Sequence, residues 1–87
     1  MAYEIRVSRP VEREVRALPQ QVRDRLRSAV RELAENPRPA GCEKLAGTND
    51  RYRIRVGDYR VVYEINDDEQ QILVETVRHR RDVYRHR

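Results

Sequence analysis

The fold of this 87-residue chain is decided by residues 51–65, which read RYRIRVGDYRVVYEI. Apolar and charged residues alternate on both sides of Gly57-Asp58, the pattern of two strands that each bury one face. A glycine at the first position between two such strands favours a two-residue turn. The stretch therefore predicts an antiparallel hairpin whose turn fixes which residues lie opposite one another.

This register gives the hairpin one apolar face and one arginine face, because residues opposite each other share a face. The face expected to pack on helices contains Tyr52, Ile54, Val56, Tyr59, Val61 and Tyr63. The other face is expected to contain Arg51, Arg53, Arg55, Arg60, Val62 and Glu64. Arg51 has Glu64 as a possible partner, whereas no acid is positioned for the other three arginines. Such a cluster suits phosphate groups, although charges on an exposed sheet face also protect it against edge-to-edge pairing.

Upstream of the hairpin, the sequence predicts one strand and two helices. Residues 2–7 alternate loosely, as in a strand. Apolar residues at helical spacing then predict two amphipathic helices joined around Pro19, with Ser8 as the N-cap of the first. Asn36-Pro37 is expected to end the second helix, because the residue before a proline avoids helical geometry.

The remaining segments complete a single small domain over residues 1–87. Residues 36–50 have the composition of a loop, which Leu45 is expected to pin to the core. A polar turn precedes a last strand over about 72–78, and 79–87 form a short basic tail. The predicted class is α+β, in the order β-α-α-β-β-β, with a helical hairpin on one face of a mostly antiparallel sheet.

Composition excludes several classes of protein. Five tyrosines with no Phe and no Trp argue against modules that stack bases on Phe or Trp rings. A single cysteine, Cys42, allows neither an internal disulfide nor a cysteine-based metal cluster, and suits a reducing compartment. No apolar run approaches the roughly 18 residues that a membrane span needs, and the start of the chain does not resemble a signal peptide. We therefore expect a cytoplasmic protein without a membrane partner.

The charge is basic and unevenly distributed. The formal net charge is +4, with a pI near 9.7, and 18 of the 19 basic residues are arginine. A pI above about 9 is the usual electrostatic footprint of a nucleic-acid binder. Residues 67–75 are acidic, whereas residues 76–87, which include the tail, carry five arginines. This tail also contains the candidates for proton transfer, which are His79, Tyr84 and His86.

Three stretches together resemble the RelE toxins of the RelE/ParE superfamily. They are Lys44-Leu45-Ala46-Gly47, the hairpin from Tyr52 to Tyr63, and Val77-Arg78-His79-Arg80-Arg81-Asp82-Val83-Tyr84. The resemblance implies the toxin of a type II toxin–antitoxin system, which cleaves mRNA in the ribosomal A site and is neutralised by a RelB-like antitoxin in a hetero-oligomer. The ParE branch of the same superfamily inhibits DNA gyrase instead and needs no nuclease site. A general nucleic-acid-binding module is a third alternative.

Carried over by position, the resemblance implies a metal-independent endoribonuclease site that uses no cofactor. Arg53 and Arg55 would hold phosphates, Arg60 would stabilise the transition state, and Arg80 would do the same or assist the leaving group. At positions 53 and 55 this chain has arginine where well-studied RelE enzymes have lysine, and arginine is a poor base. The general base is therefore left open between Tyr84, whose pKa nearby guanidinium groups would lower, and His79.

Overall fold

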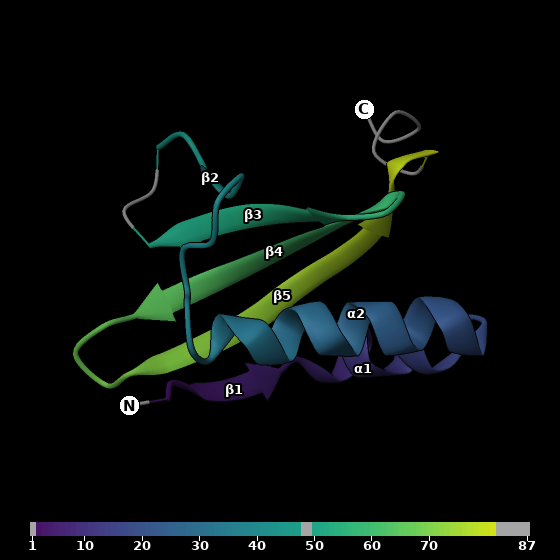
Figure 1. Ribbon diagram of the computed structural model, residues 1–87, viewed down its shortest axis with the longest axis horizontal. Coiled ribbons are helices and arrows are strands. Elements are labelled where there is room, and N and C mark those ends of the chain that lie inside the picture. The colour runs from purple at the N-terminus through teal and green to yellow at the C-terminus, as the bar shows by residue number, and fades with distance from the viewer. Residues whose placement is uncertain (1, 48–49, 82–87) are drawn as a thin grey trace.

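The computed structural model describes residues 2–47 and 50–81 and has the predicted α+β architecture. Strand β1 (Glu4–Val7) is followed by helices α1 (Arg9–Arg16) and α2 (Gln20–Leu33). The remaining elements are strands, β2 (Glu43–Lys44), β3 (Arg51–Val56), β4 (Tyr59–Asn66) and β5 (Gln71–His79). They form one five-stranded sheet in the order β1-β5-β4-β3-β2, and both helices lie on one face of it (Figure 1).

The predicted hairpin register is confirmed at every position. Tyr52 pairs with Tyr63, Ile54 with Val61, and Arg55 with Arg60 across β3 and β4. Gly57 has a φ of +60°, which a left-handed turn position requires and which glycine adopts without steric cost. The sheet is antiparallel except at β1, which pairs in parallel with β5.

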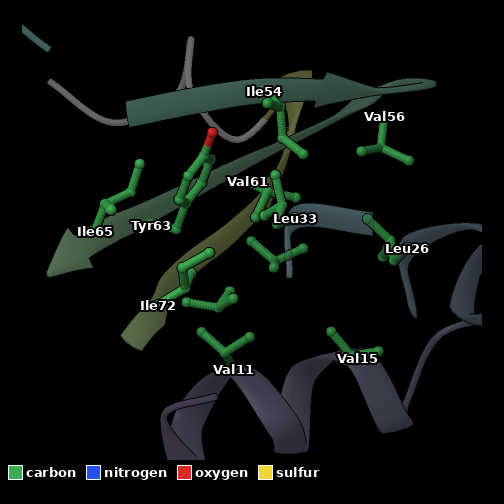
Figure 2. Packing of buried hydrophobic residues seen from close by; sticks show 12 residues of the cluster. Val11, Val15, Leu26, Leu33, Ile54, Val56, Val61, Tyr63, Ile65 and Ile72 are labelled. Atoms are coloured by element: carbon green, nitrogen blue, oxygen red, sulfur yellow. The ribbon is translucent and has the colours of Figure 1, made fainter. Parts of the chain in front are cut away.

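The core lies between the helices and the apolar face of the sheet (Figure 2). Its members are Val11, Val15, Leu26, Leu33, Ile54, Val56, Val61, Tyr63, Ile65, Ile72, Val74 and Val77. Burying each such aliphatic side chain contributes roughly 1.5–3 kcal/mol. Tyr63 is fully buried, yet its hydroxyl donates a hydrogen bond to the Pro37 carbonyl oxygen at 2.7 Å. Tyr52, expected in the same layer, is only half-buried.

The segment 36–50 departs from the prediction of an irregular loop. Glu43 and Lys44 form a short strand that pairs with Arg53 and Tyr52, so the order is β-α-α-β-β-β-β. Both residues of this strand are exposed, so it shows no apolar alternation that would predict it from the sequence. It forms because the edge of β3 is there to pair with. Cys42 packs against the core from this segment, whereas Leu45 is half-buried outside the core cluster.

Of two smaller expectations, the N-cap position of Ser8 is confirmed and the pairing of Arg51 with Glu64 is wrong. Ser8 is the N-cap residue of α1, with Pro10 in the first turn, but its side chain makes no capping hydrogen bond, and its hydroxyl is buried without a partner. Arg51 was expected to pair with Glu64, which lies opposite it, but its Nε contacts Glu75 Oε1 at 3.1 Å instead. Glu75 is the extra residue of β5 at the point where its register with β4 shifts.

Candidate phosphate-binding site

The sheet face away from the helices carries a row of arginines at one end. Arg53 and Arg55 lie on β3, and Arg60 lies opposite Arg55 on β4. Arg78 on β5 lies opposite Arg60, so three adjacent strands each contribute to one positive surface. We call these four residues, Arg53, Arg55, Arg60 and Arg78, the arginine surface. The predicted sharing of a face by the first three is confirmed, and the structure adds the fourth.

Arg78 joins this surface because of a β-bulge. The pairing of β4 with β5 shifts by one residue between Val62 and Tyr63. Without that shift, the register at Asn66 and Gln71 would place Arg78 opposite Tyr59, on the side of the helices. A one-residue shift exchanges the two faces of a strand. The sequence signal is the spacing of the buried residues of β5, which is two from Ile72 to Val74 but three from Val74 to Val77.

Two adjoining hollows follow the arginine surface. One is lined by Gly41, Glu43, Arg53, Ile54, Arg55 and Arg60. The other is lined by Arg55, Gly57, Asp58, Tyr59, Arg60 and Arg80. Arg55 and Arg60 belong to both, so the hollows meet between these two side chains. Within the part of the chain that the structure describes, neither Arg55 nor Arg60 nor Arg78 forms an ion pair.

The start of the tail is attached to the hairpin turn. The backbone N–H of Arg80 donates to the Asp58 carbonyl at 2.8 Å, and its guanidinium lies 3.8 Å from the Asp58 carboxylate. Arg80 is thereby held at the rim of the second hollow. The tail therefore starts beside Arg55 and Arg60, which line the same hollow. Tyr84 and His86 lie outside the described residues.

His79 lies away from the arginine surface. It pairs with Tyr59, and the two rings pack edge to face with their centroids 5.1 Å apart. Because Tyr59 belongs to the helix-side face, so does His79. In addition, His79 Nδ1 accepts a hydrogen bond from the backbone N–H of Arg81 at 3.1 Å. A neutral ring with an accepting Nδ1 carries its proton on Nε2 and acts there as a donor.

Among residues 2–47 and 50–81, Arg53 is the one member of the arginine surface with an acidic partner. The expectation that no acid is positioned for it is wrong. Its Nε donates to Glu43 Oε1 at 3.0 Å, and its Nη2 contacts the same oxygen. Arg53 lowers the pKa of the Glu43 carboxyl, and the more distant Arg55 and Arg60 add to this effect. The sequence did not indicate this pair because Glu43 reaches Arg53 only through strand β2.

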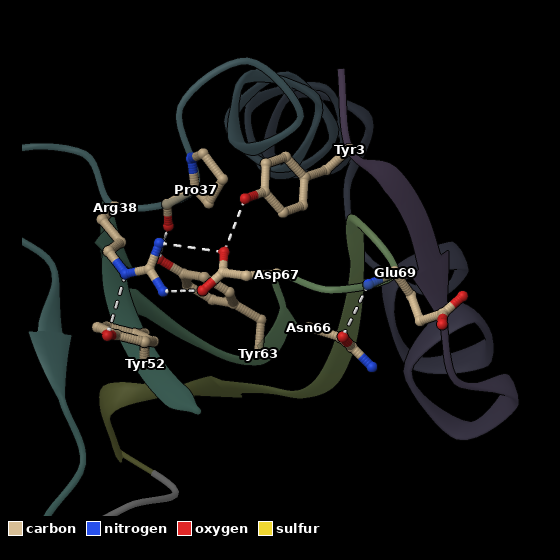
Figure 3. A network of polar contacts seen from close by, with 8 residues as sticks. All are labelled: Tyr3, Pro37, Arg38, Tyr52, Tyr63, Asn66, Asp67 and Glu69. Atoms are coloured by element: carbon tan, nitrogen blue, oxygen red, sulfur yellow. Dashed lines mark hydrogen bonds and ion pairs between the residues drawn. The ribbon is translucent and has the colours of Figure 1, made fainter. Parts of the chain in front are cut away.

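At the other end of the sheet, a second polar cluster joins three segments (Figure 3). The Arg38 guanidinium donates to Asp67 Oδ2 at 2.9 Å and to the Tyr52 hydroxyl at 3.1 Å. The Tyr3 hydroxyl donates to Asp67 Oδ1 at 2.7 Å. These contacts are intramolecular and bring together the residue before β1, the α2–β2 segment and the β4–β5 turn, and Tyr52 attaches them to β3. The cluster therefore has a structural role.

Two features that the described residues lack bear on the general class of the protein. No helix within residues 2–47 and 50–81 is long and apolar enough to cross a membrane. Over the same ranges, no three or more His, Cys, Asp and Glu residues are grouped as ligands for a metal ion. The features that remain are a small α+β fold and an open row of arginines on its sheet. The described residues therefore form a basic α+β domain with a row of arginines on one face of its sheet.

Comparison with known proteins gives the family. Residues 5–84 match the family model described as "ParE toxin of type II toxin-antitoxin system, parDE". The curated Toxin RelE3 of Methanocaldococcus jannaschii is 30% identical over 76 residues, which are 83% of this chain and 84% of that protein. The chain therefore belongs to the RelE/ParE superfamily of type II toxins, and its relatives are of the RelE type.

Solved structures agree with this assignment. The archaeal RelE–RelB complex from Pyrococcus horikoshii OT3 contains a chain with a TM-score of 0.83 and 30% identity, which covers 92% of this chain and 97% of that one. The isolated E. coli RelE toxin has a TM-score of 0.78 and 29% identity, with 97% and 98% coverage. A chain of the intact E. coli RelBE toxin–antitoxin complex has a TM-score of 0.75 and 33% identity, and the match covers 87% of this chain and 94% of that one.

Proposed function

We propose that this toxin is an endoribonuclease that cleaves mRNA in the ribosomal A site and so inhibits translation. The observation that carries the proposal is the arginine surface, whose members lie side by side on three strands. A protein that only needed solubility would not place Arg60 between Arg55 and Arg78, because like charges directly opposite each other destabilise a sheet. Anionic phosphates would relieve that repulsion.

The reaction that fits this surface uses the RNA's own 2′-hydroxyl as the nucleophile. The hydroxyl oxygen attacks the adjacent phosphorus, the bond from phosphorus to the 5′-oxygen breaks, and the products are a 2′,3′-cyclic phosphate and a free 5′-hydroxyl. Arg53 and Arg55 hold the phosphates, and Arg60 stabilises the charge that develops in the transition state. Guanidinium groups supply this charge themselves, so the reaction as proposed requires no metal and no cofactor.

The remaining roles, proton transfer and further charge stabilisation, are assigned to the tail and to Arg78. His79 packs against Tyr59 on the helix side, and its Nδ1 already accepts a hydrogen bond. We therefore assign the base that takes the 2′-hydroxyl proton to Tyr84. Arg78, directly opposite Arg60, joins it in stabilising the transition state, and Arg80 at the rim assists the leaving 5′-oxygen.

The ribosome and an antitoxin are the partners of this proposed function. An open surface holds a flexible RNA in many poses, so a ribosome that fixes the mRNA would supply the orientation that the reaction needs. The relatives from P. horikoshii and E. coli were solved as RelE–RelB complexes. By analogy, a cognate RelB-like antitoxin with an acidic, amphipathic segment would bind this basic chain in a hetero-oligomer and block its activity.

The test is mRNA cleavage on translating ribosomes with Arg60→Ala and Arg78→Ala variants. Losing a preorganised charge that acts on the transition state costs about 10²–10³ in rate, and we expect such a loss for Arg60→Ala and at least tenfold for Arg78→Ala. Arg51→Ala is the matched control. It also removes one arginine from this face of the sheet, but Arg51 is already paired with Glu75. Full cleavage by both variants would refute the proposal.

A ParE-like inhibitor of DNA gyrase is the second candidate, because the matching family model is that of ParE toxins. Such a protein would act by binding rather than by catalysis. Under this alternative, the Arg60→Ala and Arg78→Ala variants would inhibit growth as strongly as the parent. Measuring plasmid supercoiling beside mRNA cleavage after induction separates the two functions.

A further inference from the structure

Glu43 lies at the edge of the arginine surface and has no role in the proposed reaction. It is on β2, directly opposite Arg53 on β3, so the two side chains share the open face of the sheet. It also lines the first hollow together with Arg53, Arg55 and Arg60. A carboxylate thus stands where a phosphate of the RNA would have to approach Arg53.

The contact uses the part of Arg53 that a phosphate would use. Nε and Nη2 form one edge of the guanidinium, and both point to Glu43 Oε1. This edge gives two parallel hydrogen bonds to a carboxylate or to a phosphate. The positive surroundings keep Glu43 ionised, because Arg53, followed by Arg55 and Arg60, lowers the pKa of its carboxyl. At neutral pH the carboxylate is therefore charged and competes with phosphate for that edge.

We propose that Glu43 is an internal competitor of RNA phosphate at Arg53 and limits how tightly the surface binds free RNA. The inference rests on the proposed function and assigns this residue a part in substrate selection. Glu43 is largely open to solvent, with 62% of its side chain exposed, and Arg53 is about one-third exposed, at 35%. Solvent therefore reaches the ion pair, which is weak and exchangeable. An mRNA fixed at high effective concentration displaces the carboxylate, whereas stray RNA is held less tightly.

The experiment measures binding of a short single-stranded RNA with 2′-O-methyl groups, which cannot be cleaved, by fluorescence anisotropy. Relative to the parent, Glu43→Gln should bind about threefold to tenfold more tightly, because the freed edge of Arg53 gains one phosphate contact. The slope of log K against log salt should steepen by about 0.7, the value for one added phosphate contact on a single strand. Glu43→Ala should shift affinity in the same direction.

Glu75→Gln is the matched control, because it removes one carboxylate that pairs with an arginine on the same face, away from the hollows. An equal gain in RNA affinity for Glu75→Gln would show that the net charge of the protein causes the gain, and it would overturn the inference. The decisive comparison is Arg53→Ala against the double variant Arg53→Ala/Glu43→Gln. If Glu43 acts by occupying Arg53, the gain disappears in this background, and if the gain persists the inference is wrong.

Failure of this inference is distinguishable from failure of the proposed function. If Glu43→Gln binds RNA no more tightly than the parent, the inference is refuted, even where neither protein binds detectably. Cleavage on ribosomes by the parent, and its loss in Arg60→Ala, decides the proposed function separately. Circular dichroism of each variant confirms that the fold is retained.

Discussion

At position 79, a histidine that the sequence offered as a base is already engaged on both sides. Its ring packs on Tyr59, and its Nδ1 accepts the Arg81 N–H. To act as a base, Nδ1 would have to give up that hydrogen bond, and the ring would have to reach the opposite face of the sheet. These two requirements are the physical reason for assigning proton abstraction to Tyr84.

Substitution of the two candidates tests this assignment. Tyr84→Phe should lower mRNA cleavage on ribosomes by about 10²–10⁴-fold, the usual contribution of a general base, while His79→Ala should change it only a few-fold. The pH–rate profile of the parent should show a basic limb that is retained in His79→Ala. A larger loss in His79→Ala than in Tyr84→Phe, with an unchanged melting temperature, would transfer the role to His79.

Among the elements, the β3–β4 hairpin carries most of the arginine surface and depends on its turn. Gly57 has a positive φ, and a Cβ added there would lie 3.2 Å from Arg25 Nη1. The end of a flexible arginine side chain moves easily, whereas the left-handed backbone costs any residue with a Cβ about 1–2 kcal/mol. Backbone strain is therefore the dominant cost of replacing this glycine.

We expect Gly57→Ala to lower the free energy of unfolding by about 1–2 kcal/mol, measured by chemical denaturation. Gly57→Asn should lose less, because asparagine tolerates the left-handed region although its Cβ occupies the same position. Adding Arg25→Ala to Gly57→Ala should restore little. A full recovery in that double variant would show that steric contact with Arg25, not the backbone, determines the cost.

For the whole molecule, the cluster of Tyr3, Arg38, Tyr52 and Asp67 connects parts far apart in the chain (Figure 3). The hydrogen bond from Arg38 is the largest cause that holds the pKa of Asp67 below its usual value, and the one from Tyr3 adds to it. A carboxyl with a lowered pKa stabilises the folded state above its unfolded pKa of about 3.9. This stabilisation is lost as the pH falls through the lower folded value.

The expected outcome is a difference in melting temperature between the parent and Asp67→Asn that depends on pH. At pH 7 the variant should melt a few degrees lower, and the difference should shrink as the pH falls below about 4. Asp68→Asn, which removes the same charge one position further along the turn, is the control and should show no such trend. A difference that is constant from pH 7 to pH 2 would contradict the role of the Asp67 charge.

The sequence by itself determined the class of the fold, the hairpin and three of the four members of the arginine surface. These features depend on local rules, namely the period of the apolar residues and a two-residue turn that leaves one register. Once the turn at Gly57-Asp58 is placed, the sharing of one face by Arg53, Arg55 and Arg60 follows from counting.

Only the tertiary structure decided the rest. The bulge in β5 brings Arg78 onto the arginine surface and turns His79 away from it, and such a bulge depends on how Val74 and Val77 both reach the core. The strand containing Glu43 exists because an unpaired edge of β3 is available to it, not because of its own pattern. Pairing between distant segments is set by the packing of the whole sheet, so residues 43 and 78 acquired their places only through contacts that no local window contains.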